Sequence, residues 1–152
     1  MDIPEGPNYS HIRVLIVDDR AEMRVIIRSI LQHLGIRRVE TASDGEEALM
    51  KLRVKSAADM QNEERRPFNL VISDWVMPKM DGVELLHAVR NDTKLDATPF
   101  LMITSQNDKE SVLAATTLGV TDYVVKPFSA RILEQKVLSM IQGVPLPDAE
   151  SE

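Results

Sequence analysis

The chain of 152 residues carries 18 Lys and Arg against 24 Asp and Glu, so its formal net charge is −6. The length suits one folded domain, and 43% hydrophobic with 28% charged residues is the composition of a globular protein. The acidic balance argues against nucleic-acid binding, and the lack of cysteine excludes disulfides, cysteine-based zinc sites and a cysteine nucleophile.

The ends of the chain differ in composition from the rest. Residues 1–10 are rich in Pro and Gly and lack the basic and apolar regions of a signal peptide, and we predict a flexible leader there. Residues 143–152 hold two prolines and three acids, and we predict an acidic C-terminal tail. Residues 11–142 then form the single folded domain. No run of about 18 apolar residues occurs, so we expect no membrane span and a cytoplasmic location.

Short apolar runs alternate with segments of helical periodicity between these ends. Three of the runs are almost continuously apolar and rich in β-branched residues, which is typical of strands buried on both faces of a parallel sheet. The second and fifth runs are shorter and more polar, as edge strands should be. The predicted strands are residues 12–17, 38–41, 68–73, 100–104 and 122–125.

A helix is expected after each strand. The first is an apolar stripe from Met23 to Leu34 at helical spacing, ended by Gly35. Asp44 and Asp81 are placed to cap the next two helices, and Asn107 or Asp108 the helix that Gly119 ends. The last helix has the apolar stripe Leu133, Val137, Met140 and Ile141. Five strand–helix units predict a doubly wound α/β fold, a parallel five-stranded sheet with helices on both faces.

Polar residues end or directly follow four of the predicted strands, at the edge of the sheet where such folds bind ligands. They are Asp18 and Asp19, Asp74, Thr104 and Lys126. Three carboxylates at close range repel one another unless a cation joins them, and Mg²⁺ prefers such oxygen ligands. The lysine offers a positive charge and the threonine a hydroxyl to a phosphoryl oxygen. Alone, each aspartate would be an ordinary helix cap or turn residue, and the lysine a solvated one; their shared position at the strand ends argues for a site.

The same residues lie in segments that resemble a CheY-type receiver domain, the phosphoacceptor module of bacterial two-component response regulators. The matching segments are residues 14–19, 73–82, 103–105 and 119–128, and the resemblance spans about residues 12–141. It implies a flavodoxin-like or CheY-like sheet with strand order 2-1-3-4-5.

The resemblance also implies a role for each site residue. Asp74 matches the phosphoacceptor, and Asp18, Asp19, Asp74 and the backbone carbonyl of Val76 match the ligands of Mg²⁺, for which Mn²⁺ can substitute. Lys126 matches the lysine that contacts the phosphoryl group. Thr104 and Tyr123 match the switch pair. The Lys126–Pro127 bond is expected to be cis, as in that family.

By the same resemblance, we expect a phosphoacceptor signalling module that catalyses only its own phosphorylation and dephosphorylation. A histidine kinase or histidine phosphotransfer protein would donate the phosphoryl group. No output domain is apparent after Ile141, so a downstream protein is expected to bind the face of the fourth helix, fifth strand and fifth helix around Tyr123. Whether this partner is a flagellar motor, a phosphorelay protein or a kinase that uses the domain as a phosphate sink stays open.

Two other functions are weaker. A haloacid-dehalogenase-type phosphatase would carry Asp-x-Asp after the first strand, whereas Asp18-Asp19-Arg20 stands here. A binding domain that never uses phosphate would not need the acidic set and Lys126. The stretch between Asp44 and Phe68 is longer than this family usually carries, and its surplus lies around residues 54–66. We expect this surplus to be an extended second helix or a solvated loop, with an added partner contact as the alternative.

Overall fold

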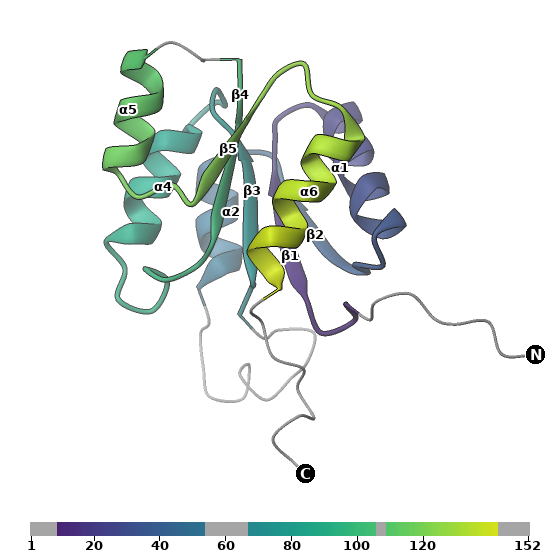
Figure 1. Cartoon of the computed structure of the whole chain (residues 1–152). Helices are drawn as coiled ribbons and strands as arrows, with labels where there is room; N and C mark the ends of the chain where they lie inside the picture. The colour runs from purple at the N-terminus through teal and green to yellow at the C-terminus, as the bar shows by residue number, and fades with distance from the viewer. Residues whose placement is uncertain (1–8, 54–66, 106–108, 143–152) are drawn as a thin grey trace, which may run out of the picture.

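The computed structural model describes residues 9–53, 67–105 and 109–142. In this part of the chain, five parallel strands form one sheet in the order β2-β1-β3-β4-β5 (Figure 1). The strands are β1 (Arg13–Val17), β2 (Arg38–Ala42), β3 (Leu70–Asp74), β4 (Phe100–Thr104) and β5 (Asp122–Val125). The predicted strand order is confirmed, and the two more polar strands, β2 and β5, are its edges.

Helices cover both faces of the sheet, which confirms the predicted doubly wound fold. They are α1 (Ala21–His33), α2 (Gly45–Leu52), α4 (Gly82–Arg90), α5 (Lys109–Thr117) and α6 (Ala130–Ile141). Figure 1 shows α1 and α6 on one face and α2, α4 and α5 on the other. None of these described helices is long and apolar enough to cross a membrane.

Two hydrophobic cores follow from the alternation of side chains along each strand. In β1, Leu15 and Val17 pack into the core under α2 and α4, while Val14 and Ile16 pack into the core under α1 and α6. Both sets of side chains are buried, which explains why β1 is an uninterrupted apolar run from Val14 to Val17 instead of an alternating pattern.

Local signals set the helix ends. Asp44 accepts a hydrogen bond from the Glu47 N–H at 2.8 Å, and Asp81 forms a reciprocal capping box with Glu84. Both predicted caps are confirmed. Gly35 and Gly119 follow α1 and α5 with φ of 97° and 93°, the left-handed conformation that ends a helix. The proposed caps Asn107 and Asp108 lie outside the described residues.

The long stretch after α2 is described only at its borders. Helix α2 ends at Leu52, and Arg53 is already extended, with φ of −79° and ψ of 123°. The helix therefore does not run on past Leu52 as the extended-helix interpretation required. Residues 54–66 themselves lie outside the described part of the chain.

The strand register brings the strand ends to one edge. Val17 pairs with Ser73, Asp74 pairs with Ile103, and Thr104 pairs with Val125. The residues that follow β1 and β5, and the last residues of β3 and β4, are consequently neighbours, although more than 100 positions separate Asp18 from Lys126 in the sequence.

Candidate functional site

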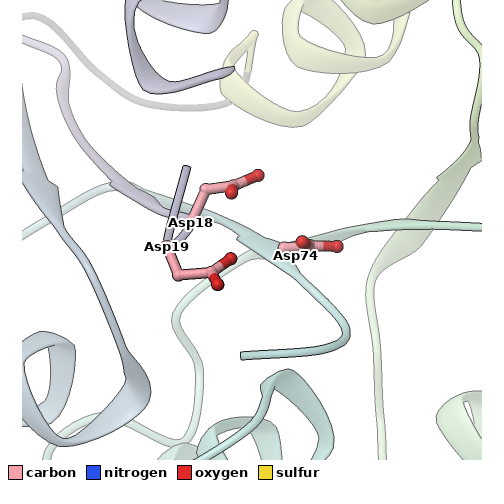
Figure 2. Close-up of side chains that lie close together, drawn as sticks. All are labelled: Asp18, Asp19 and Asp74. Atoms are coloured by element: carbon pink, nitrogen blue, oxygen red, sulfur yellow. The ribbon is translucent and has the colours of Figure 1, made fainter. Parts of the chain in front are cut away.

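Three aspartates meet where β1 and β3 end. Figure 2 shows that Asp18 and Asp19 come from the loop after β1 and Asp74 from the neighbouring strand. One oxygen from each carboxylate lies within 4.8 Å of the others. Asp18 is 1% exposed and Asp74 is 8% exposed, whereas Asp19 faces solvent. The cluster thus combines two buried carboxylates, Asp18 and Asp74, with one exposed carboxylate, Asp19.

The Asp74 carboxylate is held by two donors. The Trp75 N–H donates to Asp74 Oδ1 at 2.8 Å, and the Lys126 ammonium donates to the same oxygen at 3.0 Å. Lys126 reaches it from the end of β5, where its own N–H donates to the Thr104 carbonyl at 2.8 Å. The Lys126–Pro127 bond is cis, as expected. Among the described residues, both donors engage Oδ1, and Oδ2 accepts no hydrogen bond.

The Asp18 carboxylate has a different environment. Burial raises its pKa above the ordinary 3.8, and the nearby Asp74 charge adds to the rise. Asp18 Oδ1 accepts a hydrogen bond from the Arg20 backbone N–H at 2.9 Å, which opposes the rise. The Arg20 side chain also lies close, with Nε 3.7 Å from the same oxygen.

The loop after β3 is shaped around the Asp74 backbone. The Gly82 N–H donates to the Trp75 carbonyl at 2.8 Å and closes the loop. A Cβ on Gly82 would lie 2.2 Å from the Asp74 carbonyl oxygen and 2.9 Å from Met102 Sδ. Only glycine fits there, because a side chain would push directly on the backbone that carries the Asp74 carboxylate.

Thr104 and Tyr123 lie on the same face of the sheet. Thr104 ends β4, is 1% exposed, and follows Phe100 and Met102 toward the core under α2 and α4. Tyr123 pairs with Met102 in the register and packs, half-buried, against that core. The two side chains are therefore diagonal neighbours across adjacent strands. Val76, whose carbonyl is an expected ligand, is in the loop after β3 with 64% of its surface exposed.

The donor set fits a hard divalent cation. All three side chains offer carboxylate oxygens, the ligands that Mg²⁺ prefers, and the exposed Asp19 leaves a path for entry.

Comparison with known proteins assigns the family. The family model of the response regulator receiver domain matches residues 14–138, which make up most of the chain. The chain belongs to the response regulator receiver family. A receiver domain is a module of two-component signalling. Members of this family act through kinase and downstream protein partners.

Similar proteins have the same fold, and the chain covers nearly their whole length. The receiver domain is 37% identical to chemotaxis protein CheY of Pseudomonas aeruginosa over 133 residues, 88% of this chain and 98% of that protein. The structure of CheY4 of Vibrio cholerae matches with a TM-score of 0.72 at 34% identity, covering 85% of this chain and 98% of that one. The BeF3-activated DrrB receiver domain matches with a TM-score of 0.69 at 28% identity, covering 86% and 97%.

Two residues of the receiver domain's site were not assigned a role from the sequence. Arg20 directly follows the acidic pair, and this position was the only available signal that it would contact Asp18. Gly82 ends the segment of residues 73–82 that carries the resemblance, but it received no role of its own. Its contact with the Asp74 backbone depends on how the loop folds back, which no local pattern predicts.

Proposed function

We propose that this receiver domain accepts a phosphoryl group on Asp74 from a phosphohistidine of a histidine kinase or histidine phosphotransfer protein. The observation that carries the proposal is the placement of Asp74. Its carboxylate is 3.0 Å from the Lys126 ammonium and has an oxygen within 4.8 Å of a carboxylate oxygen of both Asp18 and Asp19. The similarity to a receiver domain described as BeF3-activated supports phosphoryl chemistry at such a site.

Asp74 Oδ2 is the nucleophile in this proposal. Oδ1 is occupied by the Trp75 N–H and Lys126, which orient the carboxylate and leave Oδ2 for attack. A bond forms between Oδ2 and phosphorus while the bond from phosphorus to the imidazole nitrogen breaks, and the leaving imidazole takes up a proton. Lys126 is placed to stabilise charge on the transferring oxygens.

Asp18, Asp19, Asp74 and the backbone carbonyl of Val76 are the proposed ligands of Mg²⁺ or Mn²⁺. The bound cation supplies charge neutralisation for phosphoryl transfer. Asp18 must be ionised to serve as a ligand, so its raised pKa makes cation binding weaken as the pH falls.

Thr104 and Tyr123 are the proposed switch residues that pass the phosphorylation signal to a downstream protein. The Thr104 hydroxyl is drawn toward the phosphoryl group, and Tyr123 packs into the space that it leaves. This biases a two-state equilibrium of the face formed by α5, β5 and α6, where a downstream protein binds. We assign the receiver function to residues 11–142, with residues 1–10 and 143–152 as flanking segments.

Phosphorylation by a small donor tests the proposal. We expect acetyl phosphate with Mg²⁺ to add one phosphoryl group to the wild-type chain, measured by intact mass, and to add none to Asp74→Asn or without Mg²⁺. Asp122→Asn is the matched control. Asp122 also pairs with a lysine, Lys136, at 2.9 Å, but it is the first residue of β5 and therefore lies at the amino-terminal ends of the strands, opposite the cluster. Equal labelling of Asp74→Asn and the wild type would refute the assignment.

A further inference from the structure

Arg20 is placed beside the acidic cluster in a way that its own helix does not explain. It occupies the N-cap position of α1, and its side chain makes no cap hydrogen bond. A guanidinium has only donors, so it cannot satisfy the free N–H groups there, and a cation at a helix N-terminus is unfavourable with the helix dipole. Asp, Asn, Ser or Thr at this position would accept a hydrogen bond from the free N–H groups and stabilise helix α1.

The contact with Asp18 explains the position of the Arg20 side chain instead. Arg20 Nε lies 3.7 Å from Asp18 Oδ1, and the Asp18 side chain is almost fully buried, while the Arg20 side chain is 46% exposed. The cluster has three carboxylates and two contacting cationic side chains. Lys126 contacts Asp74, and Arg20 contacts Asp18. Arg20 therefore compensates Asp18, which is the buried carboxylate that Lys126 does not contact.

The contact is suited to being broken. The pair is separated by more than hydrogen-bond distance, and the guanidinium is half in solvent, so the interaction is weak. The Asp18 carboxylate is held in place independently by the Arg20 backbone N–H at 2.9 Å. The side chain can consequently leave without disturbing the orientation of the carboxylate.

We propose that Arg20 is a displaceable counter-ion of the acidic cluster, which neutralises Asp18 when no divalent cation is bound and lowers the affinity of the site for that cation. The inference rests on the proposed function, because it takes the three aspartates as the cation site. A cation that binds Asp18 must displace the guanidinium or remain beside it, and either event disfavours binding.

The test compares Mg²⁺ binding by wild type, Arg20→Gln and Arg20→Lys, measured by isothermal titration calorimetry with magnesium chloride. We expect Arg20→Gln to bind Mg²⁺ about two- to fivefold more tightly, the range of one weak, half-exposed ion pair, and Arg20→Lys to bind like the wild type. Gln keeps the backbone N–H that orients Asp18. Arg53→Gln is the matched control: Arg53 is 57% exposed and pairs with Asp92, but lies at the C-terminal end of α2, away from the strand ends that carry the cluster.

A second measurement follows the side chain itself. In the wild type, the Arg20 Nε–H resonance should shift in proportion to Mg²⁺ saturation, while the Arg53 Nε–H resonance stays in place. Equal or weaker Mg²⁺ affinity in Arg20→Gln than in the wild type would overturn the inference and leave the proposed function intact. Absence of Mg²⁺ binding in wild type and variant alike would overturn both.

Discussion

Asp18 is the residue at which stability and function oppose each other. Its carboxylate is buried, and its pKa is raised above 3.8 mainly by that burial. In the pH range from 3.8 up to the raised value, the folded state binds more protons than the unfolded state. The contribution of Asp18 to stability therefore falls as the pH rises through this range, and above it the ionised group is destabilising unless a cation is bound.

Replacing Asp18 tests this conflict. We expect Asp18→Asn to increase the free energy of unfolding in EDTA at neutral pH, because it removes a buried charge while its side-chain oxygen still accepts from the Arg20 N–H. The same variant should weaken Mg²⁺ binding about tenfold or more. Urea unfolding and calorimetry measure the two effects. The exposed Asp19→Asn should leave unfolding nearly unchanged, and a loss of stability in Asp18→Asn would contradict the argument.

Lys126 is the residue with the most direct contact to the proposed acceptor. Removing its ammonium in Lys126→Ala should slow phosphorylation of Asp74 by acetyl phosphate about 10- to 100-fold at saturating Mg²⁺, because one donor to the transferring charge is lost. The control is Lys136→Ala, which deletes the matching lysine of the Asp122 pair. Equal rates in the two variants would show that the contact with Asp74 does not assist transfer.

At the scale of elements, the loop from β3 to α4 positions the acceptor. The capping box of Asp81 and Glu84 starts the helix, and the Gly82 N–H folds the loop back onto Trp75. The absence of a side chain at Gly82 lets α4 begin in contact with the Asp74 backbone. Helix start and acceptor geometry are therefore joined in one short segment.

Gly82→Ala should consequently affect both stability and chemistry. The added Cβ would overlap the Asp74 carbonyl oxygen, a backbone atom that cannot move away by itself, and we expect a loss of about 3 kcal/mol in chemical unfolding. Phosphorylation should slow as well. Asp81→Ala is the comparison, since it removes the helix cap at about 1 kcal/mol and introduces no clash. Near-wild-type unfolding and labelling of Gly82→Ala would show that the loop can relax.

For the whole molecule, the proposed signal must pass from the strand ends to the face of α5, β5 and α6. Thr104 connects the two, because it lies at the cluster edge and shares a sheet face with Tyr123. We expect beryllofluoride with Mg²⁺ to shift the Tyr123 resonances of the wild type, and Thr104→Val, which keeps the shape and loses the hydroxyl, to reduce this shift.

The control for that coupling is Thr116→Val. Thr116 is an exposed threonine of α5 whose hydroxyl donates to the Val112 carbonyl within its own helix. Its variant should respond to beryllofluoride like the wild type. An undiminished Tyr123 shift in Thr104→Val would mean that the signal does not depend on the Thr104 hydroxyl.

Much of the fold and of the candidate site could be predicted because the signals are local. Buried parallel strands need uninterrupted apolar runs, so β1, β3 and β4 stand out, and the polar residues that follow them are marked by position. The caps Asp44 and Asp81 are also local, since each accepts from an N–H three residues on. The alternation of strands and helices then leaves few possible architectures.

The sequence by itself determined which side chains reach the carboxyl edge of the sheet, because hydrophobic periodicity and capping act over a few residues. Only the tertiary structure decided which of them touch: Lys126 reaches Asp74 across 52 positions, Arg20 turns toward Asp18, and Gly82 lies against the Asp74 backbone. These contacts depend on strand register and on the path of the loops. Both are set by packing between distant segments, which is why no local pattern contains them.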